Sequence, residues 1–251
     1  LAPADVRVRV AYDDMMTIHD FCTLYGASPQ AGALVRLMDD EAVRRIYLQG
    51  LSCSATPLLF ASVSQRVGRP VVFVLQDADE AGYFYHDLTQ TMGQEQVLFF
   101  PSGYRRSVKY GQRDAASEIL RTEVLTRITS LAEGALLYVV TYPEALAELV
   151  VNKQQLDNRR LHLAVGQTVD VSQVVSQLRE LQFEGVDYVY EPGQFALRGS
   201  ILDVYSYACE YPYRIDFFGD DIDTIRTFEV QDQLSRERRQ EVDIVPELPA
   251  F

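Results

Sequence analysis

The sequence predicts an α/β protein with a parallel α/β domain in its first half and an α+β domain in its second half. In residues 28–141, short apolar runs alternate with helix-like segments, the pattern of strand–helix units in a parallel sheet. In residues 186–230, apolar segments follow one another with turn signals and little helix between them, which is typical of a β-meander. Hydrophobic residues make up 47% of the chain, enough for a sizeable core.

Capping residues mark the helix starts in the first half. Ser28 precedes Pro29, Asp77 precedes an amphipathic segment, and Pro57 suits a first helical turn. The apolar run at 70–75 predicts a strand that is buried on both faces. The expected elements are helix 28–40, strand 45–49, loop 50–56, helix 57–67, strand 70–75, helix 77–91, strand 96–100, helix 114–130 and a buried strand 135–141.

A polar stretch at residues 152–160 suggests the crossing into a second domain, which places the first domain at 1–151 and the second at 152–231. Turn signals lie at Glu191-Pro-Gly193 and Gly219-Asp-Asp221. The expected elements here are strand 161–165, helix 171–181 and β segments 186–191, 195–205, 213–218 and 224–230.

Charge and cysteine content exclude several classes of protein. With 36 acidic and 23 basic residues, the formal net charge is −13, so the whole chain repels phosphate and lacks the footprint of a dedicated nucleic-acid binder. The three cysteines are far apart and form no CxxC pair, which argues against a zinc site or a disulfide framework and favours a reducing cytoplasm.

The sequence predicts neither a membrane segment nor a secretory signal. No apolar run approaches the roughly 18 residues that span a bilayer, and residues 1–10 mix charged with apolar residues. The first residue is Leu1 rather than methionine, so we expect a processed or excised fragment of a cytoplasmic protein.

Chemistry-bearing clusters are weak. His19, His86 and His162 are scattered, so no catalytic constellation is expected, and the Asp220–Asp223 cluster is better explained as a solvated turn than as a calcium loop. Tyr104 and Tyr110 lie beside basic residues in a pattern that also suits single-stranded nucleic acid, which is a minority interpretation for so acidic a chain.

The loop at residues 50–57 lies where strand–loop–helix order would place a P-loop. Against the pattern GxxxxGK(S/T), Gly50 matches the first glycine, but Ala55 replaces the second glycine, Thr56 the lysine and Pro57 the Ser/Thr. The lysine that reaches the β- and γ-phosphates and the hydroxyl that binds Mg²⁺ are both missing, and Pro57 has no backbone N–H to offer. On these residues alone, a simple strand-to-helix connection is the preferred interpretation.

The most specific stretch is residues 186–228. It contains, in order, Val186-Asp187, Glu191-Pro192-Gly193, Phe195, Arg198-Gly199, Ile201-Leu202-Asp203, Pro212, Arg214, Asp216-Phe217-Phe218, Asp220, Ile222-Asp223, Ile225-Arg226 and Phe228. This series resembles the second domain of bacterial transcription-repair coupling factors and, more distantly, of the excision nuclease subunit UvrB. Residues 100–125 are similar to the Bacteroides-type version of the family, so the resemblance covers nearly the whole chain.

The resemblance implies a non-catalytic, UvrB-like module that recruits UvrA to stalled transcription complexes during nucleotide excision repair. It implies a RecA/helicase-like first domain carrying a degenerate P-loop and no bound cofactor, an inserted or appended UvrA-binding domain, and a return segment at 232–251. RNA polymerase and DNA would be partners through other domains of a full-length ATP-dependent translocase, and no membrane partner is implied.

The resemblance also implies which residues bind UvrA: Arg198, with Gly199 and Phe195. Arg198 and Phe195 are three residues apart on a strand, so an outward Arg198 would leave Phe195 in the core. Two departures reduce the number of positive charges expected in the contact. Ala196 stands where UvrB usually has a second arginine, and Gly185 stands where many coupling factors have an arginine.

Other interpretations remain open. Without the resemblance, Arg198 would be taken as an ion-pair partner of Asp203 or Asp216 across the sheet. The rival functions are a nucleotide-binding DNA helicase or ATPase fragment and a module that binds damaged DNA directly.

Overall fold

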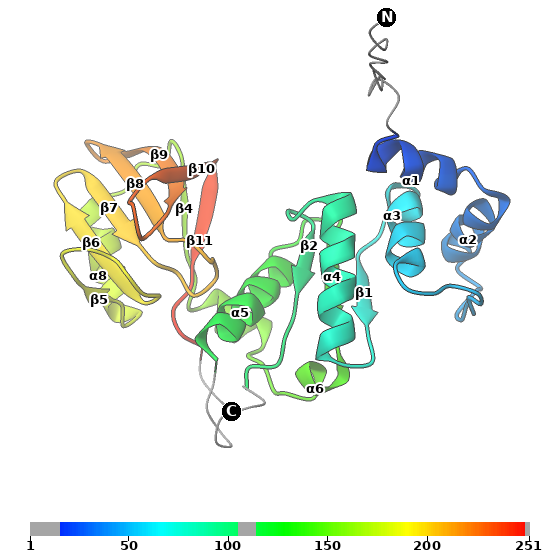
Figure 1. Cartoon of the computed structure of the whole chain (residues 1–251). Coiled ribbons are helices and arrows are strands. Elements are labelled where there is room, and N and C mark those ends of the chain that lie inside the picture. Colours follow the sequence, from blue (N-terminus) through cyan, green and yellow to red (C-terminus); the bar gives the residue numbers. More distant parts are fainter. Residues whose placement is uncertain (1–15, 105–113, 249–251) are drawn as a thin grey trace, which may run out of the picture. The chain divides into compact units, whose positions relative to one another are not determined.

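The computed structural model describes residues 16–104 and 114–248, which divide into two compact units. One unit comprises residues 1–69 and 83–97, and the other comprises residues 70–82 and 98–251 (Figure 1). The elements form a mixed α/β protein with several sheets, as the alternation of helix and strand patterns predicts. The likeness of the first half to a RecA-type domain stays a prediction.

Residues 18–67 of the first unit form three helices around a small core: α1 (Ile18–Gly26), α2 (Pro29–Asp39) and α3 (Ala55–Val67). Ser28 caps α2, because its hydroxyl accepts a hydrogen bond from the Ala31 amide at 3.2 Å. The helices pack through Ala31, Leu34, Leu59, Val63 and Val67. Gly26 allows α1 to approach α3, since a Cβ there would lie 2.6 Å from the Ser62 carbonyl oxygen.

The prediction of a strand at 45–49 is wrong. These residues have no regular structure, and Tyr47 is 87% exposed. A short apolar run becomes a strand only when a neighbouring strand pairs with it, and none in the described part of the chain does so. The following helix, α3, begins at Ala55, two residues before Pro57.

Three strands form the sheet of the first half, in the order β1 (Val71–Val74), β3 (Tyr138–Thr141) and β2 (Val97–Phe99). β1 and β3 are parallel, with Val71 opposite Tyr138. All four residues of β3 are buried, as predicted. β1 is an edge strand, and Val72 and Val74 are more than half exposed, so burial of β1 on both faces was a wrong prediction.

The helices α4 (Ala78–Met92) and α5 (Ala115–Thr129) connect these strands, α6 (Pro143–Leu146) follows β3, and Asp77 caps α4 as predicted. Asp114, at the predicted start of the next helix, caps α5. Arg121 of α5 is buried and donates to the Pro101 carbonyl oxygen at 2.7 Å. Arg121 also pairs with Glu148 at 3.2 Å. These bonds hold the loop after β2 against α5.

In the second half, α7 (Lys153–Asp157) and β4 (Leu161–Ala164) lead into α8 (Val171–Glu180) and a six-stranded sheet. In spatial order the sheet contains β10 (Ser235–Arg239), β9 (Asp221–Phe228), β8 (Tyr213–Phe218), β7 (Ile201–Val204), β6 (Gln194–Arg198) and β5 (Glu184–Gly185). Only the β5–β6 pair is parallel, and β11 (Glu241–Ile244) pairs separately with β4.

Three expectations for this half differ from the structure. Residues 186–191 form no strand, and residues 195–205 contain two strands joined by a turn instead of one. Nine residues of the expected return segment form β10 and β11, which pair with β9 and β4. β10 has the sequence SRERR and is wholly exposed, so it carries no apolar alternation by which a strand is recognised.

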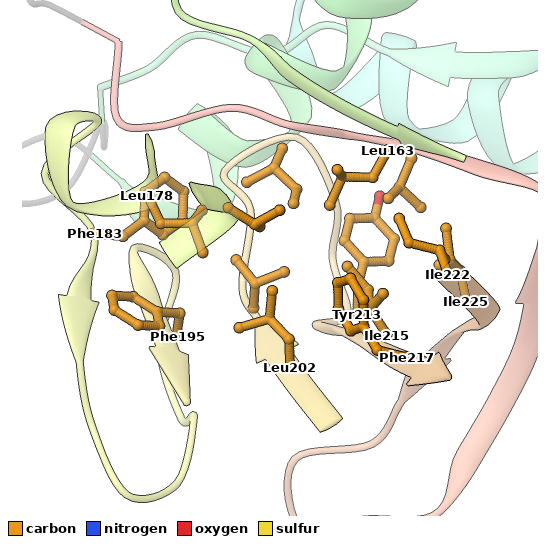
Figure 2. Packing of buried hydrophobic residues seen from close by; sticks show 14 residues of the cluster. Leu163, Leu178, Phe183, Phe195, Leu202, Tyr213, Ile215, Phe217, Ile222 and Ile225 are labelled. Carbon is orange, nitrogen blue, oxygen red and sulfur yellow. The ribbon is translucent and has the colours of Figure 1, made fainter. Parts of the chain in front are cut away.

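The core of the second half lies between α8 and one face of this sheet (Figure 2). Val174 and Leu178 of α8 are completely buried, because they recur at helical spacing on its apolar face. Figure 2 shows Phe195 at the same end of the cluster as Leu178 and Phe183. The core therefore fixes which face of β6 points inward.

Candidate functional site

A tight hairpin positions Arg198. Arg198 ends β6 and lies opposite Ile201 at the start of β7, so the turn consists of Gly199 and Ser200 only. Gly199 has a φ of +61°, a conformation that two-residue hairpin turns favour and that glycine adopts without a steric penalty. In the predicted Arg-Gly pair, Arg198 is thus the last residue of β6 and Gly199 is the first residue of the turn to β7.

Strand alternation separates two of the three residues that the resemblance assigned to this site, Phe195 and Arg198. Phe195 is only 3% exposed and belongs to the core beside α8. Arg198 lies on the opposite face of β6, as the three-residue spacing predicts. Leu197 shares the face of Phe195 but is 42% exposed, because the pairing with β5 ends at Phe195.

Arg198 is held by three neighbours. Its Nη2 donates to the Oδ2 of Asp203, and its Nη1 donates to the carbonyl oxygen of Asp187 at 2.9 Å. Its guanidinium carbon lies 5.0 Å from the centre of the Tyr188 ring, within the range of a cation–π contact. The side chain stays 36% exposed, so it is oriented by the protein and still open to solvent.

Asp203 lies beneath Arg198 and binds a second arginine. It is 1% exposed, and Arg214 donates to both of its oxygens, from Nε at 2.8 Å and from Nη2 at 2.9 Å. The hydrogen bonding that Arg214 donates to Asp203 raises the pKa of Arg214 above its usual value. Arg214 also lies 4.2 Å from the centre of the buried Phe228 ring.

The pairing of Arg198 with Asp203 is the alternative that the residues themselves suggested. The other candidate, Asp216, pairs instead with Arg226 at 2.8 Å. Arg198 can pair with buried Asp203 and still remain partly exposed, because Arg214 already donates to both oxygens of Asp203.

Sequence reasoning missed Tyr188. It lies in the irregular stretch after β5 and is 53% exposed. The one available signal was an aromatic residue within the motif stretch, but its place beside Arg198 depends on how residues 186–191 fold back. A shallow hollow of about 580 Å³ lies near this stretch, on the α8 side of β6, and is lined by Val175, Arg179, Gly185, Val186, Asp187, Phe195 and Leu197.

The second predicted site, the loop before α3, lies beside a carboxylate of α4. Gly50 has a φ of +85°, and the Ala55 amide donates to the Ser52 carbonyl oxygen at 3.0 Å. The Ser54 hydroxyl, at the N-cap position of α3, donates to Asp87 at 2.6 Å. Thr56 and the buried Pro57 follow in the first turn. A negative group thus lies beside the helix end that would attract a phosphate.

Other chemistry is sparse. In residues 16–104 and 114–248, no group of three or more His, Cys, Asp or Glu side chains could hold a metal ion. No helix of that part of the chain is long and apolar enough to cross a membrane. The basic residues beside Tyr104 and Tyr110 fall in residues 105–113, which lie outside the described residues. In β10, Arg236 stacks 4.0 Å from the centre of the Tyr211 ring.

Comparison with known proteins agrees with this arrangement. Residues 161–248 match the family model of the UvrB interaction domain, which spans the whole six-stranded sheet and α8. The transcription-repair-coupling factor of Bacillus subtilis (strain 168) is 29% identical over 206 residues, covering 82% of this chain and 17% of the relative.

Two further transcription-repair-coupling factors show similar agreement. That of Escherichia coli (strain K12) is 27% identical over 201 residues, which cover 79% of this chain and 17% of the relative. That of Staphylococcus aureus (strain bovine RF122 / ET3-1) is 27% identical over 195 residues, which cover 78% and 16%. The chain spans about a sixth of the length of these curated relatives. Residues 161–248 are thus similar to the UvrB interaction domain, and about four fifths of the chain is similar to transcription-repair-coupling factors at 27–29% identity.

Proposed function

We propose that the chain is a non-catalytic, UvrB-like module that recruits UvrA to stalled transcription complexes in nucleotide excision repair. The observation that carries the proposal is the coincidence of two features in residues 161–248. This segment matches the UvrB interaction domain, and it presents Arg198 as a fixed but accessible guanidinium. Arginine is frequent among the residues that dominate protein interfaces, and a fixed side chain loses little conformational freedom on binding.

Within the proposed contact, the three assigned residues have different roles. Arg198 contacts UvrA directly. Gly199 shapes the turn that ends β6, and Phe195 supports the strand from the core without reaching the surface. RNA polymerase and DNA would be engaged by other domains of a longer protein, whose relatives are about six times the length of this chain.

We further propose that the chain binds no nucleotide. The lysine and the Mg²⁺-binding hydroxyl of a P-loop are replaced by Thr56 and Pro57, and Asp87 adds a negative charge beside the start of α3. The same replacements weigh against the rival function of an ATPase fragment. The net charge of −13 weighs against direct binding of damaged DNA.

The test compares two matched arginines in binding to purified UvrA. Arg198 and Arg226 lie on the same face of the sheet, pair with an aspartate, and have side chains that are 36% and 35% exposed. They are three strands apart, about 14 Å. We expect Arg198→Gln to weaken UvrA binding at least about tenfold, and Arg226→Gln to change it less than about twofold.

Biolayer interferometry with immobilised chain measures both dissociation constants, and circular dichroism checks that each variant is folded. Absence of UvrA binding by the unaltered chain would refute the proposed function. Equal losses in the two variants would show that the hairpin end is not the contact.

A further inference from the structure

The buried carboxylate beneath Arg198 leaves one positive charge uncompensated. Asp203 provides a single negative charge to two guanidinium groups. Arg214 forms a two-pronged pair with both Asp203 oxygens and is 14% exposed, whereas Arg198 reaches only Oδ2 and is 36% exposed. The excess charge of this three-residue group is therefore presented to solvent at Arg198.

The position of Arg198 is set before any partner binds. One nitrogen is held by Asp203 and the other terminal nitrogen by the Asp187 carbonyl oxygen, while the Tyr188 ring lies alongside at 5.0 Å. A guanidinium has five N–H donors in one plane, so donors beyond these two bonds remain for a partner. The Tyr188 ring is 53% exposed and extends the surface beside them.

We propose that Tyr188 is a second contact residue, that Tyr188 and Arg198 together bind a carboxylate-bearing segment of UvrA, and that Asp203 and Arg214 act as positioning residues. This proposal rests on the proposed function. A planar guanidinium pairs with a carboxylate through two parallel hydrogen bonds, and a neighbouring aromatic ring excludes water and strengthens the pair. A polyphosphate partner is disfavoured, because a chain of net charge −13 repels it.

The first arm of the test uses two tyrosines of the same segment. Tyr188 and Tyr190 are 53% and 61% exposed, but Tyr190 stacks on no arginine in the described part of the chain. We expect Tyr188→Ala to weaken UvrA binding about tenfold, Tyr188→Phe to retain it within about twofold, and Tyr190→Ala to leave it unchanged. Equal losses in Tyr188→Ala and Tyr190→Ala would overturn the assignment of Tyr188.

The second arm asks whether the group that Arg198 meets is an anion. The logarithm of the dissociation constant is followed against the logarithm of salt concentration for the unaltered chain, Arg198→Lys and Arg198→Gln. We expect similar slopes for the unaltered chain and Arg198→Lys, and a flatter slope for Arg198→Gln. Arg198→Lys should bind about fivefold more weakly, because an ammonium group lacks the planar pair of donors of a guanidinium. Equal slopes in all three would overturn the carboxylate assignment.

The third arm addresses the positioning residues through kinetics. Asp203→Asn removes the buried charge and keeps the shape of the side chain. In folded protein we expect dissociation from UvrA to become about tenfold faster, while association becomes more salt-dependent because the charges of Arg198 and Arg214 are then both uncompensated. If Asp203→Asn does not fold, Arg214→Lys is used in its place, since lysine keeps the positive charge but cannot donate to both oxygens of Asp203 as arginine does. Unchanged dissociation in the folded variant would overturn the positioning role.

The outcomes separate this inference from the proposed function. If the unaltered chain binds no UvrA, the proposed function fails and this inference fails with it. If UvrA binding depends on Arg198 but not on Tyr188 or on salt, the proposed function stands and only this inference fails. Displacement of UvrA by short duplex DNA would also overturn the inference, because it would identify a phosphate as the anion.

Discussion

At the scale of single residues, Asp203 binds two guanidinium groups that differ in burial. We therefore expect the more buried Arg214 to matter chiefly for stability and the more exposed Arg198 chiefly for UvrA binding. Removing Arg214 would leave a carboxylate that is 1% exposed with only one bond, to Arg198. We expect Arg214→Met to lower the free energy of unfolding by about 3 kcal/mol, as for other broken buried pairs. Arg198→Gln leaves the two-pronged bond of Arg214 intact and should cost less than about 1 kcal/mol.

Urea denaturation followed by circular dichroism gives both free energies. A larger loss of unfolding free energy in Arg198→Gln than in Arg214→Met would contradict the expectation that Arg214 contributes more to stability than Arg198. Arg198→Glu is unsuitable as a binding probe, because it places a second carboxylate beside buried Asp203 and would lower stability together with binding.

At the scale of elements, the loop before α3 leads into a helix N-terminus but lacks the residues with which a P-loop binds phosphate and Mg²⁺. A phosphate at this helix end would meet the Asp87 carboxylate, which accepts a hydrogen bond from Ser54, and no lysine would neutralise the ligand. We therefore expect isothermal titration calorimetry with Mg-ATP to show no binding at micromolar or low millimolar concentration. Asp87→Asn removes the repulsion and serves as the matched variant.

The same absence of binding is expected for Asp87→Asn, since the missing lysine and Mg²⁺-binding hydroxyl are not restored. Micromolar affinity of the unaltered chain for Mg-ATP would contradict the proposal that the chain binds no nucleotide. Binding only in Asp87→Asn would show that a single carboxylate, rather than the changes at Thr56 and Pro57, blocks the site.

The elements that the sequence predicted are those whose signals are local. Ser28, Asp77 and Asp114 cap helices at the predicted places, because a capping side chain bonds to amides within three residues. Residues 45–49 and 186–191 are apolar but lack strand partners, and no local pattern reports whether a partner will be present. The hairpin at Arg198 was read as one strand because its turn is only two residues long.

The candidate site follows the same division. The outward direction of Arg198 and the burial of Phe195 follow from strand alternation, and the bond to Asp203 was one of two cross-strand options. The stack with Tyr188 depends on an irregular segment folding back over the strand end, which neither periodicity nor turn residues encode. The family resemblance indicated that Arg198 is a contact residue, and the structure identified the residues that surround it.

At the scale of the whole molecule, the core of the second half is self-contained. Every buried member of the cluster between α8 and the sheet lies between Leu163 and Ile244. A smaller cluster joins Val151, Leu156, Ala208 and Val245, and among the described residues that precede it, half-buried Leu125 alone packs against it. Most apolar burial in residues 150–248 thus survives removal of the preceding residues.

We accordingly expect a fragment of residues 150–248 to unfold cooperatively in urea and to bind UvrA within about threefold of the whole chain. Leu125→Ala in the whole chain is the matched control, because it removes the one side chain that the fragment loses from the smaller cluster. If the fragment is unfolded while the whole chain and Leu125→Ala both bind UvrA, the boundary at residues 151 and 152 is misplaced. The folding unit is then the larger one, which also contains residues 70–82 and 98–149.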